Sequence, residues 1–151
     1  KTGYPSRAVK IYKDKEADWI KKDKNLLSAY RKGRDQYSVS CGACHQADGK
    51  GLANMAPTLA QSDWVIGDAK RLIGLAVHGL MGPIKVNGKL VEGVPPIMPP
   101  HGFMKDEQLA GILTYVRNAW GNRAGLISTE DITRYRKTES ARVAPWTEAE
   151  F

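Results

Sequence analysis

The chain has 151 residues, of which 42% are apolar, so it is long enough to bury the core of one domain. No apolar run approaches the roughly 20 residues that a membrane-spanning helix requires. The net charge is +7, and residues 1–24 hold eight Lys/Arg against four Asp/Glu, which is +4 of that excess. No array of basic and aromatic residues accompanies the charge, so the sequence argues against nucleic-acid binding.

The basic residues 1–27 precede the core of the chain, and we expect them to form an extension, either a linker or a strap packed on the domain. Apolar residues then recur on one helical face from Leu26 to Cys41, which predicts the first long helix. Gly33 interrupts this helix. Glycine in a helix costs up to about 1 kcal/mol relative to alanine, so its presence indicates a close crossing with another helix.

The stretch Cys41-Gly42-Ala43-Cys44-His45 is a C-x-x-C-H motif, the attachment signature of c-type haem. Each cysteine sulfur can form a thioether to one haem vinyl group. The imidazole of His45 then lies where it can ligate the iron. The chain has 2 cysteines in all, and both belong to this motif.

Three alternative kinds of site fit the motif less well. A structural zinc site needs four ligands, and the remaining histidines, His78 and His101, are far apart and not at finger-like spacing. A thioredoxin-like pair should follow a strand, but residues 35–40 do not have the pattern of a buried strand. A plain disulfide leaves the adjacent His45 unexplained. The motif therefore predicts covalent haem.

Two further elements are predicted downstream of the motif. An apolar stripe from Asp68 to Leu80 has helical period. Residues 83–91 then alternate between apolar and polar around Asn87-Gly88, which is a β-hairpin signal. We therefore expect a small ribbon within a helical protein.

A second iron ligand is predicted at Met98. Prolines 95, 96, 99 and 100 surround it and fix an extended, stiff path that is suited to presenting one thioether to the iron. A methionine ligand raises the reduction potential of haem iron. The alternatives are Met55, Met81, Met104, His78 and His101. Of these, His101 lies three residues beyond Met98 and is able to replace it in another state.

The last predicted helix of the core covers Asp106–Ala119, with an apolar inner face. Residues 123–151 form a C-terminal extension. Within it, Ser128 followed three residues later by Asp131 is a helix start, and a helix over residues 128–141 is predicted. We expect this extension to pack across the domain or to lead into another one.

At this point the chain resembles class I cytochrome c. That family carries a glycine eight positions, and an aromatic residue four positions, before the first motif cysteine, and Gly33 and Tyr37 hold those places. Its first helix crosses a last helix that presents an aliphatic and an aromatic residue, and Ile112 and Tyr115 match that pair. The resemblance covers residues 28–122.

The resemblance implies an all-α class I cytochrome c fold around one haem c, bound covalently through Cys41 and Cys44. It implies His45 and Met98 as the two axial ligands. It also implies that the carbonyl of Pro57 accepts a hydrogen bond from the free ring N–H of His45, which would fix the orientation of the imidazole.

Outer-sphere transfer of single electrons is the function that this site predicts, with no catalysis of its own. Residues 82–89 are similar to haem domains associated with bacterial membrane-bound or quinoprotein dehydrogenases. A haem domain or subunit of a larger dehydrogenase or reductase is therefore the alternative. A gas sensor or a peroxidase requires an open or displaceable ligand position, which the proline-braced Met98 disfavours.

The expected partner is a redox protein, with an acidic docking surface to complement the basic balance of the chain, or a dehydrogenase or oxidase. Because c-type haem is attached outside the cytoplasmic membrane, a periplasmic or other extracytoplasmic location is expected. The sequence begins at Lys1, which we interpret as a mature form or an excised piece. Membrane association is expected only through a partner or a missing anchor.

Overall fold

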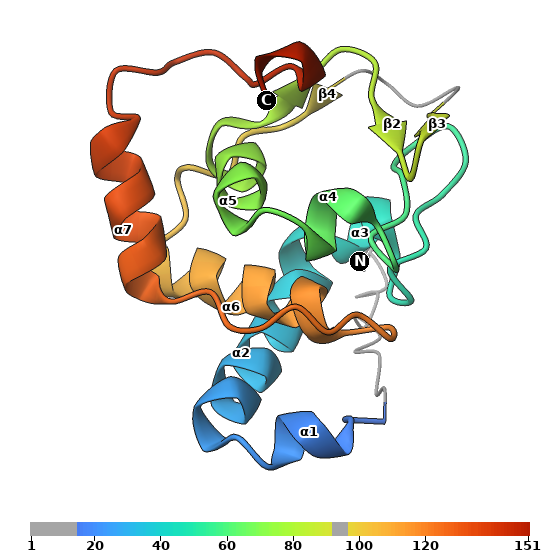
Figure 1. Cartoon of the computed structure of the whole chain (residues 1–151), viewed down its shortest axis with the longest axis vertical. Coiled ribbons are helices and arrows are strands. Elements are labelled where there is room, and N and C mark those ends of the chain that lie inside the picture. Colours follow the sequence, from blue (N-terminus) through green and yellow to red (C-terminus); the bar gives the residue numbers. More distant parts are fainter. Residues whose placement is uncertain (1–14, 92–96) are drawn as a thin grey trace, which may run out of the picture.

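The computed structural model describes residues 15–91 and 97–151. Most of the predicted N-terminal extension, and prolines 95 and 96 beside Met98, lie outside the described residues. The helices of the described part are α1 (Asp18–Lys21), α2 (Lys24–Ser40), α3 (Gly42–His45), α4 (Asp63–Ile66), α5 (Ala69–His78), α6 (Asp106–Asn118), α7 (Thr129–Thr138) and a 3-10 helix (Glu148–Glu150). The helical fold class is confirmed (Figure 1).

The core lies where α2 crosses α6, as Figure 1 shows. Tyr30, Tyr37 and Tyr115 are almost fully buried at this crossing. The ring of Tyr115 packs edge-on against Tyr30 at a centroid distance of 4.9 Å and lies 5.3 Å from Tyr37. Gly33 lies within the crossing, so the predicted close approach of two helices is present.

Side-chain caps set where two of the helices begin. The carboxylate of Asp23 accepts hydrogen bonds from the backbone N–H groups of Asn25 and Leu26, so α2 begins two residues before the predicted start. Asp68 caps α5 in the same way. That helix ends at His78, because Gly79 takes a φ of +83°, so Leu80, the last residue of the predicted apolar stripe, lies beyond the helix.

Two small antiparallel strand pairs follow α5. Strands β2 (Lys85–Val86) and β3 (Lys89–Leu90) form the predicted hairpin. Its turn residues Asn87 and Gly88 both have positive φ, as a two-residue hairpin turn of this type requires. Strands β1 (Leu80–Met81) and β4 (Ile97–Met98) form a second pair, in which Leu80 is opposite Met98. The sequence did not predict this pair.

Arg117 on α6 binds the C-terminal end of α4 and the segment that follows α6. It is buried, and its guanidinium donates to the backbone carbonyls of Val65, Gly67 and Ala124 at 2.7–3.2 Å. Burial lowers its pKa from the usual value. Carbonyl acceptors thus satisfy the buried cation, and the backbone around Val65 is held in place.

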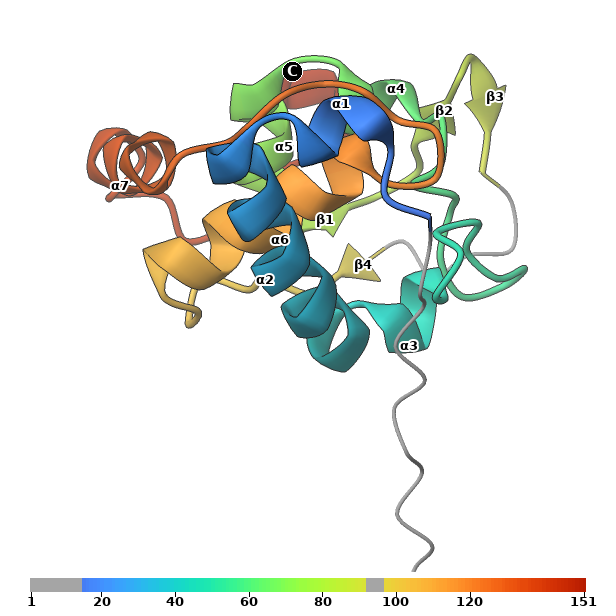
Figure 2. The same ribbon diagram turned by 90° about the horizontal axis from the view of Figure 1, so that it is seen from below.

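Helix α7 begins at the predicted place. Ser128 and Asp131 form a reciprocal capping box, and the helix ends at Thr138, three residues before the predicted end. In both ribbon views α7 lies along one side of α5 and α6, and the β2–β3 hairpin lies on the other side (Figures 1 and 2). No helix among residues 15–91 and 97–151 is long and apolar enough to cross a membrane.

Candidate haem site

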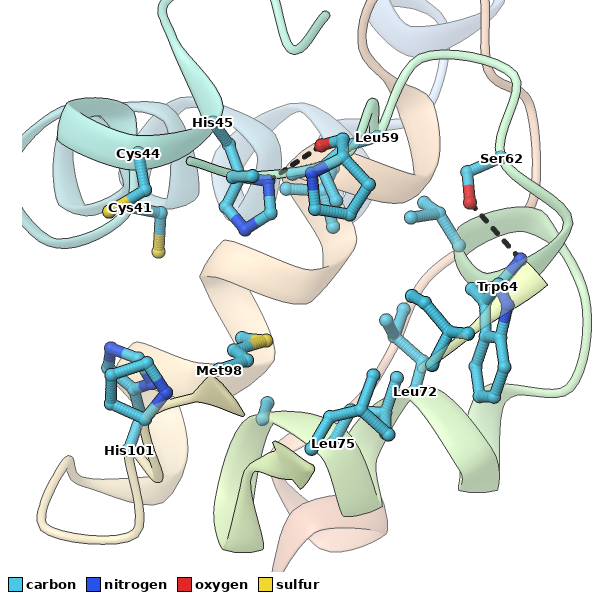
Figure 3. A pocket seen from close by; sticks show the side chains of 18 of the residues that line it. Cys41, Cys44, His45, Leu59, Ser62, Trp64, Leu72, Leu75, Met98 and His101 are labelled. Atoms are coloured by element: carbon cyan, nitrogen blue, oxygen red, sulfur yellow. Dashed lines mark hydrogen bonds between the residues drawn. The ribbon is translucent and has the colours of Figure 1, made fainter. Parts of the chain in front are cut away.

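A cavity of about 510 Å³ lies beside the α2–α6 crossing. Its volume falls within the range of about 300–1,000 Å³ that ligand sites span. Its walls come from α3, residues 55–59, α4, α5, the hairpin, β4 and α6, and most of the lining side chains are apolar. The side chains of Cys41, Cys44, His45 and Met98 all line this cavity (Figure 3).

Cys41 lies at the junction between α2 and α3, and Cys44 lies on α3, which turns away from α2. The backbone changes direction at Cys41, whose N–H still donates to the carbonyl of Tyr37 at 2.9 Å. The hydroxyl of Tyr37 donates to the carbonyl of Gln46 at 2.6 Å, which ties the far end of the motif back to α2. The two cysteines are not joined by a disulfide, and before any bond to haem forms, burial raises the pKa of the Cys41 thiol to about 11, with Cys44 adding to the rise.

His45 is held in one orientation and one tautomer. Its Nδ1 lies 3.1 Å from the carbonyl oxygen of Pro57, and because a carbonyl only accepts, Nδ1 carries the proton. The other ring nitrogen points into the cavity in Figure 3. Burial lowers the pKa of His45, the bond to Pro57 opposes that change and His101 adds to it. A neutral imidazole with one free lone pair is the form that ligates a metal.

The loop after the motif needs its two glycines. Gly49 and Gly51 have φ of +66° and +72°. The N–H of Gly51 donates to the carbonyl of His45 at 3.0 Å, and a Cβ on Gly51 would overlap with the backbone of residues 56 and 57. Trp120 lies against Gly49 and donates its indole N–H to Ala47 at 3.0 Å. The sequence did not predict this contact between Trp120 and the haem-motif loop.

Met98 lies across the cavity from His45, with its sulfur inside (Figure 3). His101 also lines the cavity, and in Figure 3 it lies to one side, on the same wall as Met98. The backbone N–H of His101 donates to the carbonyl of Ala76 at 2.8 Å, which attaches this segment to α5. The structure thus brings together all five residues of the predicted site, counting Pro57.

The other candidate ligands divide into two groups. Met55 and Met104 line the cavity, Met55 on the loop that holds His45 and Met104 just before α6. Met81 and His78 are not among the residues that line it. His78 instead forms a 2.8 Å hydrogen bond with the hydroxyl of Tyr135.

This set of groups fits one kind of prosthetic group. Two thiols, a neutral imidazole nitrogen and a thioether surround an apolar cavity, which matches the attachment points and ligands of a covalently held haem. The fold and the site therefore define a haem-binding domain of the c type. In agreement, the model of the cytochrome c family matches residues 30–120, and the chain belongs to this family.

Several curated proteins are similar to the chain. The cytochrome c subunit of the quinone alcohol dehydrogenase of Gluconacetobacter polyoxogenes is 31% identical over 111 residues, covering 70% of this chain and 22% of that protein. The cytochrome c subunit of gluconate 2-dehydrogenase of Pantoea cypripedii is 30% identical over 142 residues, covering 86% and 31%. Cytochrome c-552 of Thermus thermophilus is 35% identical over 88 residues, covering 56% and 65%.

Membership of the cytochrome c family shows the general function of the chain. As a cytochrome c domain, the chain attaches haem c covalently and transfers electrons. The chain spans only 22% and 31% of the two dehydrogenase subunits. The alignment with the gluconate dehydrogenase subunit covers 86% of this chain, so it extends beyond residues 30–120 at both ends.

Proposed function

We propose that the domain carries single electrons through an iron ligated by His45 and Met98, with thioethers at Cys41 and Cys44. The observation that carries this proposal is the placement of His45 and Met98 on opposite walls of one apolar cavity beside the cysteine pair. When bound, the haem supplies an iron that cycles between the ferric and ferrous states.

The chain's own residues would set how this iron behaves. The hydrogen bond from His45 to Pro57 fixes the imidazole plane and raises the basicity of the ligating nitrogen. Apolar walls from α5 and α6 exclude water and disfavour the more highly charged ferric state. Two protein ligands leave no position for a substrate, so the domain relays electrons and performs no substrate chemistry itself.

The partner that we propose is a dehydrogenase in the same polypeptide or complex. Two of the relatives are named as cytochrome c subunits of a quinone alcohol dehydrogenase and of gluconate 2-dehydrogenase. We place the domain outside the cytoplasmic membrane, where such a complex would deliver electrons. Within the chain, residues 28–122 would form the cytochrome domain, and residues 1–27 and 123–151 would be its extensions.

Two exposed lysines beside the cavity, Lys50 and Lys89, support the proposal that the partner docks through an acidic surface. A second hollow, between residues 50–58 and the β2–β3 hairpin, shares Pro57 and Val91 with the wall of the haem cavity. Lys50 and Lys89 line this hollow, and both side chains are exposed. Lysines placed next to the haem cavity would steer a partner with an acidic surface toward it.

Substrate-driven reduction tests the proposal. Membranes of the source organism that contain the whole complex are supplied with ethanol or gluconate, and the haem absorption of this domain is followed. We expect reduction by at least one of the two donors, and slower reduction when Met98 is replaced by alanine. If ascorbate reduces the haem but neither substrate does, the proposed dehydrogenase partner is wrong, while electron transfer by the domain stands.

A further inference from the structure

The C-terminal segment that follows α6 returns to β1, the strand that pairs with the Met98 strand. The family match ends at residue 120, so α7 and residues 139–151 lie beyond it. In Figure 1 this segment leaves α6, forms α7 along the side of the molecule, and ends beside β1 and β4. It contacts the surroundings of Met98 at two places, and further hydrogen bonds hold it to α5.

The first contact is with β1, the strand that pairs with the Met98 strand. Trp146 pairs with Leu80 in a parallel bridge: its N–H donates to the carbonyl of Gly79 at 3.0 Å, and its carbonyl accepts from Met81 at 2.7 Å. Leu80 is in turn paired with Met98 across β1 and β4. Residue 146 is therefore bridged to one edge of β1, and the strand that carries the proposed ligand pairs with β1.

The second contact lies just after Met98 in the chain. Arg136 on α7 donates to the carbonyls of Gly102 and Met104 at 2.7 and 2.5 Å, and to the carboxylate of Asp106 at 2.7 Å. The guanidinium and this carboxylate are both partly buried. One cation thus holds the loop between β4 and α6 through charge-assisted bonds, which are about twice as strong as neutral ones.

A series of hydrogen bonds also holds the segment to α5. The indole N–H of Trp146 donates to the hydroxyl oxygen of Tyr135 at 2.8 Å, and that hydroxyl lies 2.8 Å from Nδ1 of His78. A Cβ on Gly74 would lie only 3.0 Å from the indole nitrogen and 3.1 Å from the hydroxyl. The glycine therefore allows the segment to pack directly on α5.

We infer that residues 128–151 act as a C-terminal brace that keeps the sulfur of Met98 in place for the iron, with Arg136 and Trp146 as positioning residues. The inference rests on the proposed ligation by Met98. Strands β1 and β4 have two residues each, and an isolated pair of strands is marginal at best in water. The bridge from Trp146 to β1 and a fixed loop after β4 would limit how far Met98 can move away.

A weakened brace would raise the population of states in which Met98 has left the iron. An exogenous ligand binds only those states, so its apparent affinity rises in proportion to that population. Imidazole binding to the ferric protein therefore measures the brace directly. The intensity of the ferric charge-transfer band of methionine–iron ligation reports the same equilibrium without added ligand.

The experiment compares Arg136→Gln with Arg134→Gln in the full, haem-loaded chain. Arg134 is on the same helix and is exposed, and its ion pair is with Asp131. We expect Arg136→Gln to bind imidazole about tenfold more tightly than the unmodified protein and to lose part of the charge-transfer band. Arg134→Gln should match the unmodified protein in both measurements.

Trp146→Leu tests the other contact and should shift imidazole affinity in the same direction. Arg136→Lys keeps the cation but not the planar set of donors, and it should lie between the unmodified protein and Arg136→Gln. If Arg136→Gln fails to fold, the imidazole affinities of Trp146→Leu and Arg136→Lys test the inference instead. The brace is refuted if folded Arg136 and Trp146 variants retain the unmodified imidazole affinity and band. Absence of the band from the unmodified protein would instead refute Met98 as the ligand.

Discussion

Gly33 on α2 faces the backbone of Gly111 on α6, and this pair sets how closely the two helices approach. A Cβ built on Gly33 would overlap with the carbonyl oxygen of Gly111 and would lie 3.0 Å from the Cβ of Tyr115. The relationship is not symmetric. A Cβ on Gly111 would lie 3.4 Å from the nearest atoms of Gly33, which is ordinary contact.

Gly33→Ala should therefore destabilise the protein, whereas Gly111→Ala should not. The first substitution forces the two backbones apart at the crossing. Overpacking costs about 1–3 kcal/mol, and we expect the free energy of unfolding to decrease by an amount near the upper end of this range. The second gains up to about 1 kcal/mol of helix propensity and should be neutral or slightly stabilising. Urea unfolding of both haem-loaded variants measures this, and equal midpoints would contradict the geometry.

Met98 and His101 are distinguished by replacing each with alanine. Met98→Ala should abolish the charge-transfer band, lower the reduction potential and admit cyanide or carbon monoxide to the iron, because a thioether ligand favours the ferrous state. His101→Ala should retain the band and the closed iron. The matched control is Met104→Ala, which removes another methionine that lines the cavity. If His101→Ala rather than Met98→Ala opens the iron, the ligand assignment is reversed.

Local signals in the sequence were enough for the elements that carry the site. The spacing of Cys41, Cys44 and His45 indicated the haem, and Asn87-Gly88 marked the hairpin, because each depends on a few adjacent residues. Gly33 indicated a crossing because glycine lowers the stability of a helix relative to alanine. The sequence does not mark its partner Gly111, since nothing local in α6 distinguishes a contact glycine from a tolerated one.

Local sequence patterns could not predict the pairing of β1 with β4. Leu80 and Met98 are separated by the hairpin, and each strand has only two residues, too few to show an alternating pattern. The same is true of Trp146, whose place is set by backbone hydrogen bonds to residues far back in the chain. Contacts of this kind depend on the tertiary fold, so only the structure shows that the C-terminal segment reaches β1, beside the Met98 strand.

The two lysines beside the cavity should govern the rate at which an acidic partner docks. Replacing both Lys50 and Lys89 with glutamate should slow the second-order reduction of the haem about tenfold at low ionic strength, because steering by surface charge is lost. The effect should shrink as salt rises above about 0.1 M, where the screening length falls to about 10 Å. Stopped-flow measurements with the partner complex test this.

The control for the lysine variant reverses two cations away from the hollow, Lys21 and Lys137, and so changes the net charge equally. If it slows reduction as much as the variant at Lys50 and Lys89, net charge rather than a local docking site is responsible. A rate that rises with added salt in the unmodified protein would oppose an acidic partner altogether.

His78 should make the stability of the protein depend on pH. Burial lowers the pKa of His78 from 6.5, the hydrogen bond to the Arg142 carbonyl opposes this, and the remaining charges that face it are those of Arg142, Glu139 and Arg136. The hydroxyl of Tyr135 lies against Nδ1. The hydroxyl oxygen accepts the indole N–H of Trp146, and the hydroxyl hydrogen can donate to Nδ1 when that nitrogen is unprotonated.

The direction of the pH effect follows from the lowered pKa. Between the folded-state pKa and about 6.5, the unfolded chain binds more protons at His78 than the folded one, so stability falls as the pH is lowered through this interval. His78→Gln removes the titrating group. Urea unfolding at pH 7.5 and pH 5 should show a larger loss of stability for the unmodified protein than for His78→Gln. An equal loss in both would place the acid sensitivity at other groups.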